Sequence, residues 1–357
     1  MSTATSSPVT GRRRLLAAVG AATGLLLATA CSGEAPSVPP PAVSGSERDL
    51  SFTVDGTRVF GTFTAPTDTA GAVPAALIVS GSGPTDRDGN AQTRPDADTN
   101  LNLARVLADA GVASLRYDKL GSGETGLGDL DPEAPIDPEV HDRQLVAAYE
   151  QLTAQPGVDP DRTVVVGHSE GALFALRAHD LLDTSPALVL AAPPGTRYLD
   201  LIDRQLTERI RVGEAQGRIG ETDSVTVLSD ARAGRAALRG GRDLPDDLSP
   251  LLETVYSEQN AAFLGWIDAF DPVDLAEDVP EDTSVLVLWG EEDAQIPRSD
   301  IDRLMTGFAD AERVDIPDAD HVFREFRDRP GAAVLDADRP FAPEVAPALE
   351  DFLAQAW

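Results

Sequence analysis

The sequence is poor in the residues that build disulfides and metal sites. Cys31 is its only cysteine among 357 residues, so no intramolecular disulfide can form. It also has no cluster of cysteines and histidines with the spacing of a zinc site. We therefore expect no metal and no cofactor, and a fold held by the substantial core that a hydrophobic content of 42% can supply.

Positive charge is scarce as well. The chain has 29 lysines and arginines against 60 aspartates and glutamates, for a net charge of −31, and Lys119 is its only lysine. Nucleic acid is a polyanion that such a chain repels, and the sequence contains no basic stripe. We therefore expect no nucleic-acid partner, and the sequence indicates no particular protein partner.

A long apolar run is also missing. The apolar stretch 15–30 is too short to favour a membrane-spanning helix. It follows three arginines at 12–14 and ends in L-A-T-A-C, which is typical of an export signal over residues 1–31. The small residues before Cys31 resemble a bacterial lipobox, which implies cleavage before this cysteine and a lipid on its sulfur.

This leader predicts a lipoprotein anchored to the outer face of the cell membrane, with the lipid on Cys31 as its only membrane contact. A plain secretory signal with an incidental cysteine is the alternative. The paired arginines allow the twin-arginine export route beside the general secretory one. Residues 32–48 are rich in proline, serine and glycine and predict a solvated tether.

Strand and helix patterns alternate from residue 49 onward. Asp55-Gly56 between apolar residues predicts a hairpin, and short apolar strands follow at 75–80, 112–117, 163–166, 187–192, 284–289 and 313–316. Helices are expected at 101–110, at 140–154, directly after Gly171 and at 341–356. The alternation predicts an α/β fold with a mostly parallel central sheet and helices on both faces. Ligands bind such sheets beyond the carboxyl ends of the strands.

The alternation stops between residues 193 and 280. No convincing strand occurs there, and apolar residues follow helical spacing in three stretches, at 199–210, 248–255 and 263–270. We interpret residues 193–280 as a helical cap inserted into a core that comprises residues 49–192 and 281–357.

The stretch T-V-V-V-G-H-S-E-G at 163–171 carries the strongest catalytic signal. Its three valines predict a buried strand, and G-H-S-E-G fits the motif G-x-S-x-G with a helical pattern after it. In this context a sharp turn lifts the serine hydroxyl off the edge of the sheet. We predict that Ser169 is a catalytic nucleophile.

A serine needs a base to become nucleophilic, and the base needs an orienting partner. His321 lies in a loop just after the last predicted strand, from which it can reach Ser169. Asp293 follows the strand 284–289 by a short turn and is the predicted acid, with Glu291 and Glu292 as alternatives.

The negative charge that develops on a substrate carbonyl oxygen needs hydrogen-bond donors. The backbone N–H of Glu170 stands at a helix N-terminus, which suits an anion. A second N–H is expected from Ser82, or alternatively from Gly83, in the loop after the strand 75–80. The run D-R-D-G-N at 86–90 lacks the bidentate glutamate of a calcium loop, and we interpret it as a self-bonded turn that braces this loop.

Six motifs together resemble a bacterial α/β-hydrolase family described as serine aminopeptidase S33-like or esterase/lysophospholipase-like. In chain order they are G-S-G-P-T-D-R-D-G-N, L-R-Y-D-K-L-G-S-G, G-H-S-E-G, F-D-P, L-W-G-E-E-D and D-H-V-F. The resemblance covers about residues 50–357. It implies an α/β-hydrolase fold with a nucleophile at Ser169, an acid at Asp293, a base at His321 and a lid, in the order of that fold.

These features predict a serine hydrolase that cleaves carboxylic esters of small or medium substrates through an acyl-enzyme on Ser169. The alternative is an S33-type aminopeptidase or amidase. Its substrate amine would bind carboxylates of the cap, for which the candidates are Glu208, Glu214, Glu253 and Glu258. A non-catalytic binding lipoprotein and an acyltransferase are further alternatives. The expected ligand is a small-molecule ester or amide.

Overall fold

The computed structural model describes residues 45–67, 69–327 and 332–357. The predicted export signal with Cys31 lies outside the described residues, as does most of the predicted tether. Within the described ranges, no helix is both long enough and apolar enough to span a membrane.

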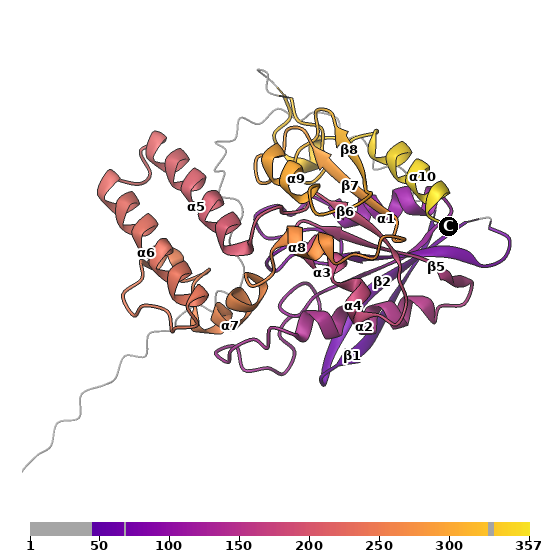
Figure 1. The fold of residues 1–357 in the computed structure, drawn as a ribbon, viewed down its shortest axis with the longest axis horizontal. Coiled ribbons are helices and arrows are strands. Elements are labelled where there is room, and N and C mark those ends of the chain that lie inside the picture. Colours follow the sequence, from indigo (N-terminus) through magenta and orange to yellow (C-terminus); the bar gives the residue numbers. More distant parts are fainter. Residues whose placement is uncertain (1–44, 68, 328–331) are drawn as a thin grey trace, which may run out of the picture.

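One eight-stranded sheet organises the molecule (Figure 1). Its strand order is β1-β2-β4-β3-β5-β6-β7-β8, and β2 pairs antiparallel with both β1 and β4, whereas all other neighbours are parallel. The predicted mostly parallel sheet is therefore confirmed. The strands are β1 (Gly45–Val54), β2 (Thr57–Pro66), β3 (Val73–Val79), β4 (Ala113–Tyr117), β5 (Val158–His168), β6 (Ala187–Ala191), β7 (Val285–Gly290) and β8 (Glu312–Ile316).

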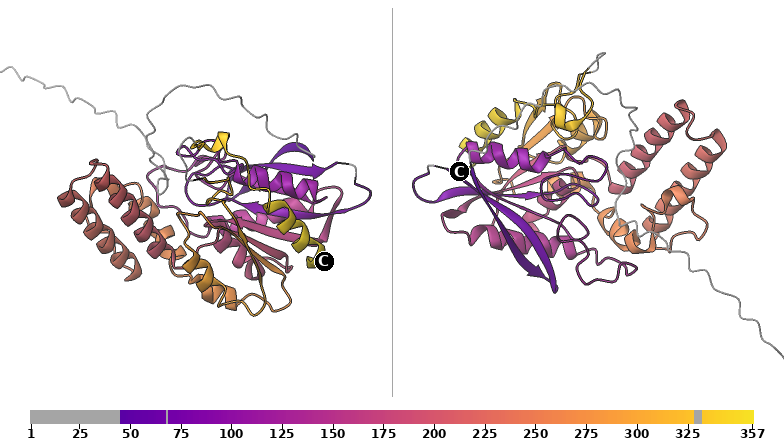
Figure 2. Two further views of the ribbon diagram at one scale, coloured as in Figure 1. Left: turned by 90° about the horizontal axis from the view of Figure 1, so that it is seen from above. Right: turned by 180° about the vertical axis from the view of Figure 1, so that it is seen from behind.

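Helices cover both faces of this sheet and form a projection at one end (Figure 2). Those of the core are α1 (Thr99–Asp109), α2 (Val140–Thr153), α3 (Gly171–Leu176), α4 (Ala178–Leu181), α8 (Pro272–Glu277), α9 (Arg298–Leu304), the short 3-10 helix η2 (Asp336–Asp338) and α10 (Val345–Ala356). Those between β6 and α8 are α5 (Tyr198–Ala215), α6 (Glu221–Arg239), the 3-10 helix η1 (Pro250–Leu252) and α7 (Glu258–Ile267).

Alternating side chains of the parallel strands fill two separate cores. Leu77 and Val165 belong to the cluster that includes residues of α2 and α3, whereas Ile78 and Val166 belong to the cluster of α1 and α10. Successive side chains of a strand point to opposite faces, so a strand buried on both faces must be apolar throughout. This explains why the run of valines at 164–166 forms a central strand.

The insertion between β6 and β7 projects from the sheet as the paired helices α5 and α6, followed by η1 and α7 (Figure 1). The Ser257 side chain caps α7 by accepting a hydrogen bond from the N–H of Asn260 at 3.2 Å. α8 follows, and it packs on α3 and α9 over the sheet.

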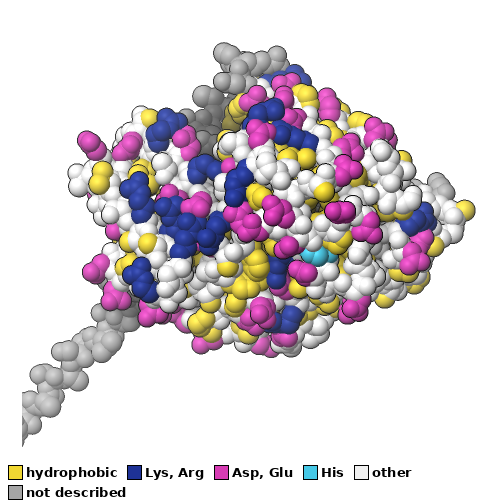
Figure 3. All heavy atoms as spheres, viewed as in Figure 1, with side chains coloured by type: hydrophobic (Ala, Val, Ile, Leu, Met, Phe, Trp, Pro, Cys, Tyr) yellow, Lys and Arg dark blue, Asp and Glu magenta, His cyan; other side chains and the backbone are white. Residues whose placement is uncertain are grey.

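Ion pairs hold the base of this insertion together. Asp268, whose side chain is 1% exposed, binds Arg197 at 3.0 Å and Arg239 at 2.7 Å and also accepts the N–H of Leu199 at 2.7 Å. It thus joins the start of α5 to the ends of α6 and α7. Figure 3 shows lysine and arginine side chains gathered over this part of the surface, interspersed with acidic ones. The acidic residues at the base of the insertion are therefore paired with arginines.

Three local features differ from the sequence prediction. β1 begins at Gly45, inside the predicted tether 32–48, because β2 extends to Pro66 and pairs with it along its whole length. The stretch 248–255 forms only the short η1, which begins with Pro250. The sequence did not predict α6 as a separate helix. Its buried face consists mostly of small residues, such as Ala231 and Gly234, which give a weak apolar pattern.

The burial of Leu77 in the central strand β3 leads to a prediction about stability. Leu77 is fully buried, so Leu77→Ala should lower the free energy of unfolding by about 2–5 kcal/mol through lost burial and the cavity left behind. Urea denaturation measures this change. Leu130→Ala, at a side chain that is 47% exposed, is the control and should change it by less than about 0.5 kcal/mol. Equal effects at the two positions would contradict the packing described.

Candidate active site

Ser169 occupies a strained turn between β5 and α3. Its φ is +54°, in the left-handed region, and its N–H donates to the carbonyl of Ala191 at 2.8 Å. The two flanking glycines are sterically required. A Cβ on Gly167 would lie 2.3 Å from the carbonyl oxygen of Gly171, and a Cβ on Gly171 would lie 2.3 Å from that of Val79. This is the strand–turn–helix context that the motif needs.

Asp293 and His321 are brought together by the loops after β7 and β8. The Nδ1 of His321 lies 2.8 Å from the Oδ2 of Asp293, whose side chain is fully buried. The other carboxylate oxygen of Asp293 accepts the N–H groups of Gln295 and Ile296 at 2.7 and 2.9 Å. A carboxylate accepts only, so His321 donates from Nδ1, and its Nε2 is the nitrogen that remains for a reacting group.

The alternative acids Glu291 and Glu292 are both exposed, and Glu291 pairs with Arg298 at 3.2 Å. The structure therefore joins His321 to Asp293 and not to either neighbour.

Ser169 and His321 border one cavity of about 50 Å³, together with Gly81 and Ser82. Among the described residues no hydrogen bond joins the Ser169 hydroxyl to His321. In enzymes without bound substrate, hydrogen bonds between catalytic groups are often long and tighten only when substrate binds.

His168 links the serine turn to the histidine loop. Its Nε2 lies 2.9 Å from the carbonyl oxygen of His321, and burial, aided by the neighbouring His321, lowers its pKa to about 3. It is therefore neutral and donates this bond. The sequence indicated no role for this side chain, so the bridge to the backbone of His321 was missed.

The Gly81–Ser82 peptide lies directly beside the serine. A Cβ on Gly81 would stand 3.2 Å from the Cβ of Ser169. Within the described chain, the backbone N–H groups of Ser82 and Glu170 donate no hydrogen bond to protein atoms. Two unpaired N–H groups near a serine are what an oxyanion needs.

The loop after Ser82 is braced by its own bonds. The Oδ1 of Asp86 accepts the N–H groups of Asp88 and Asn90 at 3.0 and 2.9 Å, and the Ser80 hydroxyl donates to the carbonyl of Asp86 at 3.0 Å. The predicted self-bonded turn is confirmed. The Asp86 carboxylate is used in these bonds, that of Asp88 binds Arg116 at 3.0 Å, and the described residues contain no cluster arranged to hold a metal ion.

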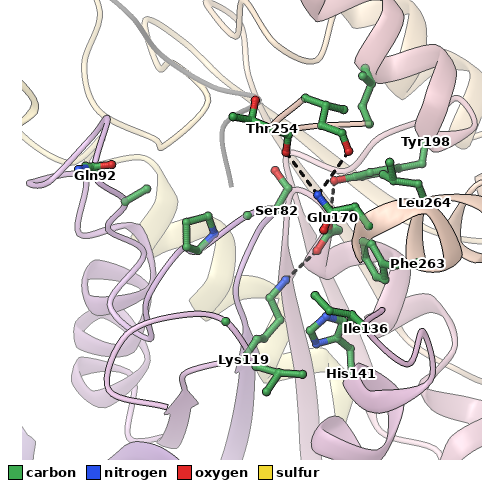
Figure 4. Close-up of a pocket in the computed structure, with 18 of the residues that line it drawn as sticks. Ser82, Gln92, Lys119, Ile136, His141, Glu170, Tyr198, Thr254, Phe263 and Leu264 are labelled. Atoms are coloured by element: carbon green, nitrogen blue, oxygen red, sulfur yellow. Dashed lines mark hydrogen bonds and ion pairs between the residues drawn. The ribbon is translucent and has the colours of Figure 1, made fainter. Parts of the chain in front are cut away.

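A second cavity of about 110 Å³ adjoins the first and shares Ser82 with it (Figure 4). Its walls come from the loops after β3 and β4 and from the helical insertion. They are largely apolar, with contributions from Leu120, Ile136, Ile202, Val255, Phe263 and Leu264.

Three buried polar side chains meet in the wall of this cavity (Figure 4). The Nζ of Lys119 donates to Glu170 Oε1 at 2.7 Å and to the carbonyl of Gly81 at 2.8 Å, and the Tyr198 hydroxyl donates to Glu170 Oε2 at 2.5 Å. Burial raises the pKa of Glu170, but the charge and hydrogen bond of Lys119 outweigh burial and lower it below its ordinary value. Sequence reasoning missed this network, although Lys119 stood out as the only lysine.

The carboxylates proposed to bind a substrate amine lie elsewhere. Glu208, Glu214, Glu253 and Glu258 are all exposed, and none is among the described residues that line the two cavities. Glu208 pairs with Arg211 at 2.6 Å instead. The structure therefore does not bring these four candidates to the cavities beside Ser169.

A sequence model of the Alpha/beta hydrolase family matches residues 76–337. The chain is also 31% identical over 128 residues to the polyketide transferase ATR5 of Stachybotrys chlorohalonatus. That alignment spans 34% of this chain and 42% of the relative, so the chain matches less than half of the relative's length.

Solved structures of esterases and hydrolases have a similar fold. Est1E of Butyrivibrio proteoclasticus, solved with ferulic acid, has a TM-score of 0.53 and 17% identity, covering 86% of this chain and 98% of its own. The alpha/beta hydrolase GrgF of a Penicillium species has a TM-score of 0.54 and 17% identity, covering 87% and 99%. At this identity the likeness establishes the fold alone, and the predicted α/β-hydrolase fold is confirmed.

His141, which lines the second cavity, leads to a prediction of how the stability of the fold depends on pH. Burial, together with the charge of Lys119, lowers the pKa of His141 to about 4, whereas an unfolded histidine has a pKa of about 6.5. Below pH 6.5 His141 is protonated in the unfolded chain but remains neutral in the folded chain. The free energy of unfolding therefore decreases as the pH falls. His141 should thus remove about 1–2 kcal/mol of unfolding free energy between pH 7 and pH 5.

His141→Gln should reduce this dependence, measured by urea denaturation at pH 7, 6 and 5. An unchanged difference in unfolding free energy between pH 7 and pH 5 would contradict the prediction.

Proposed function

The chain belongs to the alpha/beta hydrolase family, and on this premise we propose that it is a serine hydrolase that cleaves carboxylic esters of small or medium substrates. One observation carries the proposal. His321 is held by Asp293 at 2.8 Å through Nδ1 and borders the same cavity as Ser169. This placement, and the order Ser169, Asp293, His321 along the chain, support the proposal that these residues act as nucleophile, acid and base.

The reaction follows from these positions. Nε2 of His321 accepts the proton of the Ser169 hydroxyl while the serine oxygen attacks the ester carbonyl carbon, and Asp293 stabilises the resulting imidazolium. The N–H groups of Ser82 and Glu170 bind the oxyanion. His321 then protonates the leaving alcohol, and water, deprotonated by His321, releases the acid from Ser169.

The larger cavity indicates the size of the acyl group. It adjoins the serine's cavity at Ser82, is mostly apolar and measures about 110 Å³. An apolar group of short to medium length buries its surface there and gains about 25 cal/mol per Å². A long chain would have to displace the helical insertion, because Ile202, Val255 and Leu264 form part of the wall.

An acyltransferase is the second candidate, favoured by the matching stretch of a relative that is named a polyketide transferase. Both reactions share the acyl-enzyme on Ser169 and differ only in whether water or another nucleophile attacks it. The aminopeptidase alternative has less support, because its four proposed carboxylates are exposed and Glu170, the carboxylate in the cavity wall, is already bound by Lys119 and Tyr198.

Hydrolysis of p-nitrophenyl esters tests the proposal. Ser169→Ala should lower kcat/KM at least about 10³-fold, because the nucleophile is gone and only binding and oxyanion stabilisation remain. Activity should peak at short to medium acyl chains. The control is Ser114→Ala, which removes a buried hydroxyl without a partner and should leave the rates unchanged.

A fluorophosphonate probe gives the decisive readout. The wild type should be labelled at Ser169 and Ser169→Ala should not. Absence of labelling, together with silence on esters and on amino-acyl amides, would favour a non-catalytic binding lipoprotein. Faster product formation with an added alcohol, without faster hydrolysis, would indicate the acyltransferase.

We also propose that the protein is exported and anchored by a lipid on Cys31, on the basis of the leader sequence alone. In a bacterial host that processes lipoproteins, the full chain should incorporate labelled fatty acid and fractionate with membranes. Cys31→Ser should abolish both. Equal labelling of the two chains would contradict the anchor, and release of the unlabelled wild type would indicate a plain secretory signal.

A further inference from the structure

Lys119 contacts both segments whose backbone N–H groups are expected to bind the oxyanion, one at a carbonyl and the other at a side chain. Its Nζ donates to the carbonyl of Gly81 at 2.8 Å and to the side chain of Glu170 at 2.7 Å. We propose that Lys119 is a positioning residue of the oxyanion hole, which sets the orientation of the Ser82 N–H and ties it to the serine turn. The inference rests on the proposed serine-hydrolase function and adds a residue that this function does not itself require.

The rigidity of the peptide group explains how Lys119 acts at a distance. The carbonyl of Gly81 and the N–H of Ser82 belong to one planar, trans peptide unit and point in opposite directions. An ammonium on the carbonyl side therefore directs the N–H to the other side. A hydrogen bond from a charged donor also polarises the peptide, which makes the N–H on the far side a stronger donor.

Glu170 connects this peptide to the nucleophile. Its backbone N–H is the other expected oxyanion donor, and it directly follows Ser169. Its side chain, which is 3% exposed, holds Lys119, so the ammonium links the Gly81–Ser82 peptide to the residue that carries the other donor. An oxyanion hole works only when its donors are held within a fraction of an ångström of the oxygen.

Tyr198 brings the helical insertion into the same network. It is the first residue of α5, and its hydroxyl donates to the second oxygen of Glu170 at 2.5 Å. Burial, and then the charge of Glu170, raise its pKa well above the ordinary value, so it stays a donor. The start of the insertion is thereby anchored to the two predicted oxyanion donors.

The contribution of this network to the stability of the fold does not explain its presence. Burying a lysine and a glutamate costs desolvation energy that their attraction often only balances, and apolar residues of similar volume serve the core as well. The Lys119 side chain is 3% exposed, and its Nζ also faces the Phe174 ring, whose centre lies 5.6 Å away and which attracts the cation only weakly compared with a carboxylate. The carbonyl of Gly81 is the contact that an apolar residue cannot replace.

The test compares the full chain with two variants. Lys119→Met removes the carbonyl ligand but leaves Glu170 without its cation. Lys119→Met/Glu170→Gln removes both charges and so avoids an unpaired buried carboxylate, which otherwise endangers folding. Circular dichroism and urea denaturation select folded protein. Both variants should lose about 10²-fold in kcat on p-nitrophenyl esters, since a displaced donor has this effect, with KM little changed.

A transition-state analogue separates positioning from a general structural role. A trifluoromethyl ketone forms an oxyanion on Ser169, so its inhibition constant should rise by the same factor as kcat/KM falls. The control is Arg177→Met, which breaks a partly buried ion pair, to Asp142 at 2.6 Å. It should lower stability yet leave the inhibition constant unchanged.

The outcomes distinguish this inference from the function on which it rests. A wild type without ester hydrolysis or fluorophosphonate labelling overturns both. An active wild type whose folded double variant keeps its kcat and its inhibition constant overturns the role of Lys119 alone. The role of Lys119 is supported if kcat falls and the inhibition constant rises in parallel in the double variant, and neither change occurs in Arg177→Met.

Discussion

The site depends on how closely two backbones approach at the carboxyl ends of β3 and β5. These strands are parallel neighbours, with Val79 paired to Gly167, and the first residue of α3, Gly171, lies against the carbonyl of Val79 with no room for a side chain. This contact brings the loop after β3 beside the serine turn. Gly81 then lies against Ser169, and both residues border one small cavity together with Ser82.

The scarce positive charges of the chain are used at specific contacts. The chain has a net charge of −31, yet its only lysine is buried beside the serine, bound to a glutamate and a backbone carbonyl. A cation in this place balances Glu170 and orders the loop after β3. The rest of the positive charge is arginine, and at the base of the insertion arginines bind Asp268 and join α5, α6 and α7.

The helical insertion contributes both a wall and a tether to the cavity. Ile202 and Leu264 supply apolar surface, while Tyr198 binds Glu170 at the point where α5 begins. The wall of the cavity and the placement of the proposed oxyanion donors therefore involve the same segment. In a lipoprotein of the proposed kind, this would let the shape of the acyl group influence the chemistry through the cavity wall.

The order of the strands and helices could be predicted from the sequence, because hydrophobic periodicity and glycine turns are local properties. The motif around Ser169, and the loops that carry Asp293 and His321, could be found for the same reason: each directly follows a predicted strand, and parallel strands bring their carboxyl ends to one edge. Only the tertiary structure decided which carboxylate contacts His321, that His168 binds the backbone of His321, and that Lys119, Glu170 and Tyr198 meet. These contacts join residues 28 to 153 positions apart, and their partners are set by packing in three dimensions, which no pattern of neighbouring residues records.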